Sequence, residues 1–149
     1  MLEKNIVVVQ KGSGNTQIDF FNLNKRERIK SISGFEFHGT NVGKKFCKVN
    51  DELLLIYGEK NLYIVDIFSY QLINKIECET LYVLYKISDN VVLSGHSNGE
   101  IMQWKCNGRE VKLFSNKKQS HDSGIFSFLK MNDNIILLGG VYGKIKIWK

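Results

Sequence analysis

The sequence predicts an all-β protein made of repeated short sheets, and three observations carry that prediction. Apolar residues recur with a period of two over most of the chain, and no stretch sustains the i, i+3, i+4, i+7 spacing of an amphipathic helix. Short apolar runs end at Gly, Asn or Asp at roughly the 8- to 12-residue intervals of turn-linked strands. The 149 residues include no alanine and no proline but many β-branched and aromatic residues, a composition that disfavours helices.

An internal repeat narrows this all-β prediction to one architecture. Three segments that begin at Asp51, Asp89 and Asp133 superimpose without a gap, and each contains an apolar strand, a Gly-containing turn and a second strand. A weaker fourth copy opens the chain at Leu2. A period near 40 residues with strand–turn–strand content is the signature of a propeller blade. We therefore expect a β-propeller built of four-stranded antiparallel blades.

The register of the repeats assigns strands to each part of the chain. Residues 1–33 are expected to supply the second, third and fourth strands of one partial blade. Residues 44–79 and 81–115 supply two complete blades, and residues 125–149 supply the first three strands of another. Propellers close with about 4 to 8 blades. We therefore expect an incomplete ring in this chain, completed by a second copy as a homodimer, by a partner chain or by the rest of a longer product.

Two kinds of segment resemble the WD-repeat family. Ser120–Phe128 resembles the Gly-His segment that leads into a WD-repeat blade, and Gly140–Trp148 resembles its Gly-rich turn and Trp-bearing third strand. Ser94–Trp104 is a better copy of that second half. The sequence departs from the family pattern where Lys follows both Trp residues in place of Asp, and where Asp66 stands at the Trp position of the second repeat.

The resemblance also implies a structural role for a few polar residues. In the family, His, Ser or Thr, Asp and Trp side chains form a hydrogen-bonded set within each blade. The resemblance assigns this role to Ser94, Asn98 and Trp104 in the third repeat, where Glu77 occupies the His position, and to His121 and Trp148 in the fourth. Such a network satisfies buried polar groups, so we expect it to stabilise the blades rather than to catalyse a reaction.

Several classes of function are not expected from this sequence. Cys47, Cys78 and Cys106 form no C-x-x-C pair, which argues against a disulfide framework or zinc site and favours a reduced intracellular setting, cytoplasmic or nuclear. None of the three histidines has metal-ligand spacing, and His96 is expected to lie solvated in a turn. No apolar run approaches the roughly 18 residues of a membrane helix. We expect no enzyme activity, no cofactor, no bound metal and no membrane association.

The resemblance implies a non-catalytic protein–protein interaction scaffold or adaptor. Its binding face would be formed by the turns between second and third strands and by the segments that lead into first strands. The residues expected there are Glu59, Lys60, Ser97, Asn98, Asp122, Ser123, Val141 and Tyr142. Tyr142 occupies a turn and is expected to be exposed, and exposed aromatic residues are good partner contacts.

The basic character of the chain leaves a second interpretation open. The net charge is +6, which could indicate an RNA or other nucleic-acid partner, for example within a ribonucleoprotein. The lysines, however, are spread along the whole chain, and arginine, which makes forked contacts to phosphates and bases, is scarce. An excess of AT-rich codons explains the many lysines equally well, so nucleic-acid binding remains the alternative to the scaffold.

Overall fold

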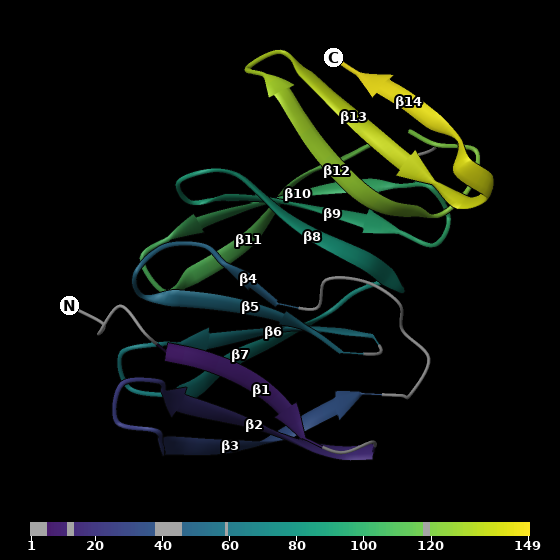
Figure 1. The fold of residues 1–149 in the computed structure, drawn as a ribbon. Coiled ribbons are helices and arrows are strands. Elements are labelled where there is room, and N and C mark those ends of the chain that lie inside the picture. Colours follow the sequence, from purple (N-terminus) through teal and green to yellow (C-terminus); the bar gives the residue numbers. More distant parts are fainter. Residues whose placement is uncertain (1–5, 12–13, 38–45, 59, 118–119) are drawn as a thin grey trace.

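The computed structural model describes residues 6–11, 14–37, 46–58, 60–117 and 120–149. These residues form four antiparallel sheets and one short 3-10 turn, η1 (Val141–Gly143), and they contain no α-helix. The sheets follow one another along the chain and stack side by side (Figure 1). The prediction of an all-β fold with antiparallel blades is confirmed, and the arrangement is that of a partial β-propeller.

Each sheet is built from strands that are consecutive in the sequence. The first sheet contains β1 (Ile6–Lys11), β2 (Gly14–Asn22) and β3 (Glu27–Phe37). The second contains β4 (Phe46–Lys48), β5 (Leu53–Tyr57), β6 (Asn61–Asp66) and β7 (Gln71–Glu77). The third contains β8 (Leu81–Ser88), β9 (Val91–His96), β10 (Ile101–Asn107) and β11 (Glu110–Lys117). The fourth contains β12 (Ile125–Asn132), β13 (Ile135–Gly140) and β14 (Ile145–Trp148).

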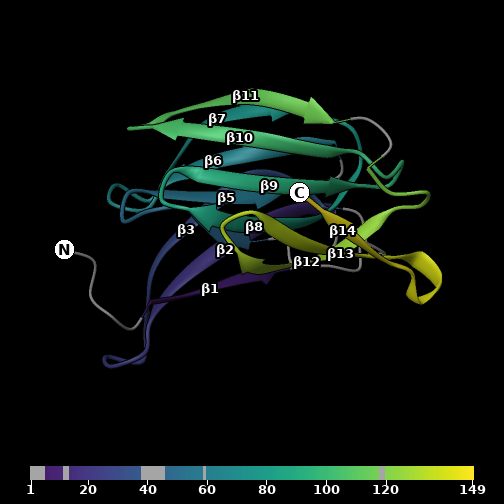
Figure 2. The same ribbon diagram turned by 90° about the horizontal axis from the view of Figure 1, so that it is seen from above.

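The core lies between the sheets rather than within a single layer. Seen from above, the first strands β8 and β12 lie along one side of the stack and the fourth strands β7 and β11 along the other (Figure 2). One apolar cluster fills each of the three spaces between successive sheets. The second sheet is therefore covered on both faces, which explains why every residue of β5 is buried and why β5 reads as a continuous apolar run.

Polar contacts add specificity to this stacking. The Glu36 backbone N–H donates to the Tyr63 hydroxyl at 3.0 Å, and the Lys130 backbone N–H donates to the Tyr85 hydroxyl at 3.2 Å. Each of these bonds joins neighbouring sheets. At one end of the strands, the Arg109 guanidinium of the third sheet lies 2.6 Å from the buried Asp66 carboxylate of the second. These contacts fix how far one sheet can slide past the next.

Two details of the sequence prediction need correction. Strand β3 continues to Phe37 and β11 to Lys117, past the expected boundaries at 33 and 115, and Phe37 is buried against the second sheet. Residues that the sequence repeat makes equivalent also have different cross-strand partners after the β5–β6 turn. Trp104 lies opposite Val92, whereas Val65, not Asp66, lies opposite the equivalent Leu54. The β5–β6 turn is one residue shorter than the β9–β10 turn, and this shift displaces every later residue of β6.

Candidate functional site

One end of the stack gathers the connections that the sequence predicts to bind a partner. The turns β5–β6, β9–β10 and β13–β14 lie there, together with the linkers that enter β8 and β12 (Figure 1). We call this end the linker face. Of the predicted binding residues, it carries Lys60, Ser97, Asn98, Asp122, Ser123, Val141 and Tyr142. Glu59 lies outside the described residues. The topology thus brings all the described candidates to one end, and their role in binding stays a prediction.

A buried chain of hydrogen bonds supports the linker face in the third sheet. The Trp104 indole Nε1–H donates to Ser94 Oγ at 2.8 Å, and Ser94 Oγ lies 2.7 Å from His96 Nε2. His96 Nδ1 lies 3.2 Å from the carbonyl oxygen of Glu79, in the linker that enters β8. Ser94 and His96 are fully buried. This chain anchors the incoming linker to the centre of the sheet.

The geometry also assigns the protons in this chain. The Glu79 carbonyl oxygen can only accept a hydrogen bond, so Nε2 of the neutral His96 ring is left to accept from the Ser94 hydroxyl, whose oxygen accepts from the indole. His96 then carries its proton on Nδ1 and donates to the Glu79 carbonyl, an assignment made from the hydrogen-bond network. Burial lowers the pKa of His96 below its ordinary value, which favours this neutral form. The expectation that His96 is solvated is therefore wrong.

Asn98 does not belong to the buried network, which corrects the assignment from the family pattern. Its side chain is exposed, and its Oδ1 accepts from the Glu100 backbone N–H at 3.1 Å within the β9–β10 turn. The same turn contains Gly99 at a φ of 80°, where an added Cβ would overlap the His121 carbonyl oxygen. The His121 backbone N–H donates to the Gly99 carbonyl at 3.0 Å. Gly99 thus permits the close approach that ties this turn to the next linker.

The fourth sheet uses its histidine differently. His121 is buried and its Nδ1 accepts from the Ser123 backbone N–H at 3.3 Å and lies 3.1 Å from the Ser123 hydroxyl. Its ring packs on Gly140, and its Nε2 has no partner among the described residues. The half-buried Trp148 instead lies under the Lys117 ammonium, 4.9 Å from the ring centre. His121 therefore bonds Ser123 and not Trp148, the other residue that the resemblance assigns to the network of this repeat.

Tyr142 is the most exposed aromatic side chain of the linker face. It is 92% exposed and sits at the centre of η1 with a φ of 61°. The preceding Val141 holds the turn through its backbone N–H, which donates to the Gly124 carbonyl at 3.3 Å. The prediction that Tyr142 is exposed is confirmed. An aromatic ring on a backbone-anchored turn loses little freedom when it contacts another molecule.

Charged side chains around this aromatic turn are paired. The exposed Asp122 accepts a hydrogen bond from Lys146 and lies 4.0 Å from the Lys144 ammonium. The hydrogen bond from Lys146 is the main reason that the pKa of Asp122 is lowered. Other lysines pair in the same way at the opposite end, as Lys48–Asp51, Lys86–Asp89 and Lys130–Asp133. Because carboxylates accompany these lysines, they do not form a uniformly basic surface.

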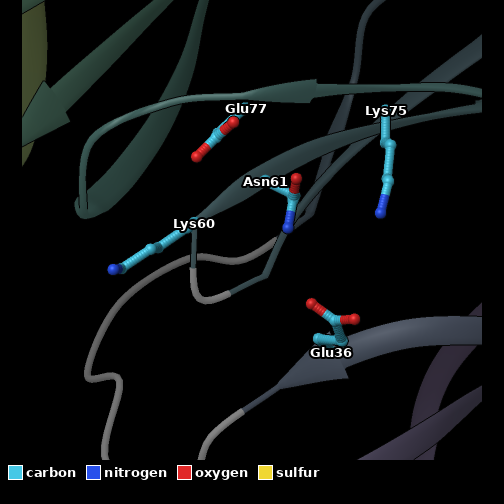
Figure 3. Close-up of a pocket in the computed structure, with 5 residues that line it drawn as sticks. All are labelled: Glu36, Lys60, Asn61, Lys75 and Glu77. Atoms are coloured by element: carbon cyan, nitrogen blue, oxygen red, sulfur yellow. The ribbon is translucent and has the colours of Figure 1, made fainter.

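A small polar pocket opens between the first two sheets at the linker face. It has a volume of about 380 Å³, and its lining consists of Glu36, Lys60, Asn61, Lys75 and Glu77. The Glu36 carboxylate points across the pocket toward Asn61 and Lys75 (Figure 3). The pocket lining contains two acidic and two basic side chains, so their formal charges cancel, and it contains no serine, cysteine or histidine. Sequence reasoning missed this pocket, because Glu36 joins the others only through sheet stacking.

The described residues offer little for covalent or metal chemistry. Burial raises the pKa of Cys78 and Cys106 to about 11, so both remain thiols at neutral pH. Within the described ranges, no three His, Cys, Asp or Glu side chains gather closely enough to hold a metal ion. The Ser94–His96 pair has the residue types of a nucleophile and its base, but no substrate can reach two fully buried side chains.

Comparison with known proteins identifies the fold but not a family. No protein-family model and no curated protein matches the sequence. A chain in the crystal structure of a mitotic checkpoint complex resembles this one with a TM-score of 0.70 and 15% sequence identity. The match covers 97% of this chain and 45% of the other, so this chain spans a little under half the length of its structural neighbour. At this identity the likeness establishes the fold alone, which is the partial β-propeller described above.

None of the described residues belongs to a helix long and apolar enough to cross a membrane.

Proposed function

We propose that this chain is a non-catalytic protein-interaction scaffold of WD-repeat type that binds its partners through the linker face. The observation that carries the proposal is the exposed Tyr142 on a turn held by backbone hydrogen bonds, beside other exposed turn residues at the same end of the stack. The buried hydrogen bonds of His96 support the proposal, because they anchor the linker that enters β8 at the same end of the stack. Rigid turns that present an aromatic residue suit recognition of a folded protein or a peptide.

A matched pair of aromatic variants tests the linker face. Tyr142→Ala removes the exposed ring from that face, and Phe68→Ala removes a ring that is 69% exposed in the β6–β7 turn at the opposite end. Partners crosslinked to the native chain should be lost with Tyr142→Ala and retained with Phe68→Ala. Equal capture by both variants would contradict the proposal.

Salt dependence separates this proposal from nucleic-acid binding. Between about 0.05 and 0.2 M salt, binding to RNA or DNA through several phosphate contacts falls by orders of magnitude, because condensed counterions are released. Binding through an aromatic and apolar contact should change little over that range. A steep loss, together with nuclease-sensitive capture, would favour the nucleic-acid alternative over the scaffold.

A further inference from the structure

Asparagine is followed by glycine at two places in the chain, Asn98–Gly99 and Asn107–Gly108. Asparagine is chemically labile in this context, because glycine has no side chain to keep its backbone nitrogen away from the amide carbon of the asparagine. Both asparagine side chains are exposed, and both dipeptides lie at hairpin turns of the third sheet. The two sites thus share their reacting groups and differ in how the fold holds them.

The fold locks the first dipeptide. Asn98 Oδ1 accepts from the Glu100 backbone N–H at 3.1 Å. Gly99 is buried, and its backbone N–H donates to the His96 carbonyl at 3.1 Å. The Gly99 carbonyl accepts from the His121 backbone N–H at 3.0 Å, so the next linker holds the turn from its other side. The glycine nitrogen that could react with the side chain is therefore hydrogen-bonded and shielded from water.

The second dipeptide lies at the tip of the β10–β11 hairpin, at the end of the stack opposite the linker face. Asn107 pairs with Glu110 across the hairpin, which leaves a two-residue turn between them. Gly108 is exposed and has a φ of 56°, the conformation that a type II′ turn gives to glycine. Within the described structure, neither the Gly108 N–H nor the Asn107 side-chain amide has a hydrogen-bond partner. Water therefore has access to the nitrogen at this site.

We propose that Asn107 is a site of spontaneous modification, where the side-chain amide is converted to aspartate and isoaspartate while Asn98 is protected. The Gly108 nitrogen bonds to Cγ of Asn107, and the side-chain nitrogen leaves as ammonia with the proton that Gly108 gives up. Water then opens the cyclic imide. Cleavage of the new bond to Cγ gives aspartate, and cleavage of the bond to the main-chain carbonyl carbon gives isoaspartate, whose backbone runs through Cγ.

Isoaspartate formed from Asn107 changes a contact between the second and third sheets. It lengthens the main chain and adds a negative charge beside Arg109. The Arg109 guanidinium lies 2.6 Å from the Asp66 carboxylate, which is 1% exposed. The longer turn moves this guanidinium, and a buried carboxylate that loses its cation is unfavourable. Modification therefore lowers the stability of the chain with time, and it leaves the linker face at the other end of the stack unchanged.

Peptide mapping of the full chain after incubation at mildly alkaline pH tests this site. Trypsin separates the two asparagines, because cleavage after Lys105 and Arg109 places Asn107 in a peptide of its own. In the folded chain, Asn107 should convert at least about tenfold faster than Asn98, because the locked turn must first break several hydrogen bonds. In urea, where both turns are unfolded, the two rates should converge.

A matched pair of variants connects the modification to stability. Asn107→Ser has no amide to lose at this turn and should keep its melting temperature throughout the incubation. Asn98→Ser should lose stability as the wild-type chain does. Equal conversion of the two asparagines in the folded chain, faster conversion of Asn98, or conversion of Asn107 only in urea would each overturn the proposal. A modified wild-type chain that melts unchanged contradicts the effect on the Arg109–Asp66 contact.

Discussion

The third and fourth sheets both bury a histidine beneath the linker face, but only the third completes its hydrogen bonding. His96 is linked on one side to Ser94 and through it to Trp104, and on the other to the Glu79 carbonyl. His121 uses one ring nitrogen for Ser123 and leaves the other without a described partner. The difference teaches that two repeats of one fold can support the same face either by a satisfied polar chain or by packing.

One residue contributes to this difference. Leu138 occupies the position in β13 that Ser94 occupies in β9, as the shared register of the two sheets shows. Leu138 offers no hydroxyl to the Trp148 indole, and the ring is half-buried under Lys117. Trp104, by contrast, is 2% exposed and belongs to the cluster between the second and third sheets.

The largest expected difference is between the two tryptophans. Trp104→Ala should lower the free energy of unfolding by about 3–5 kcal/mol, because it opens a cavity in a close-packed core and breaks the hydrogen bond to Ser94. Trp148→Ala should cost less than about 2 kcal/mol, because its ring is already partly in water. Urea denaturation of both variants measures the contrast, and equal losses would show that the two sheets are supported alike.

A smaller difference is expected between two serines. Ser94→Ala should cost about 1–3 kcal/mol, because it leaves the buried Trp104 N–H and His96 Nε2 without partners. Ser123→Ala is the matched control and should cost about 1 kcal/mol or less, because the Ser123 backbone N–H still bonds His121. If the control loses as much stability as Ser94→Ala, the buried chain in the third sheet has no special role.

The fold was predictable from sequence because strand period and repeat length are local signals. All residues of β5 and nearly all of β9 are buried, whereas buried residues alternate with half-buried ones in β13. A turn that contains glycine follows each of these strands. What failed was register. A turn one residue shorter between β5 and β6 puts Val65 rather than Asp66 at the Trp104 position, and gapless sequence alignment conceals that shift.

The buried network was only partly predictable for a related reason. Ser94 and Trp104 are joined as the family resemblance implies, but the third member is His96 and not Asn98. Residues two apart in a strand share a face, so Ser94 predicts a buried His96 once β9 is known to continue that far. Whether His96 joins the network therefore depends on where β9 ends, and local sequence pattern specifies strand ends poorly.

The smallest expected effect is a pH dependence from His96, since it changes one protonation equilibrium and leaves packing intact. Burial lowers the pKa of His96 in the folded chain, so the unfolded chain takes up the proton first as the pH falls. Stability should therefore decline as the pH drops below the ordinary histidine value of about 6.5 and level off once the folded form is also protonated. The aspartates with lowered pKa, Asp66 and Asp122 among them, affect stability only below about pH 4 and do not contribute in this pH range.

Urea midpoints of the wild-type chain and of His96→Gln, measured between about pH 5 and 7.5, isolate the effect. The variant should be less stable at neutral pH and show a flatter profile, whereas parallel profiles would mean that His96 is not held neutral by the third sheet.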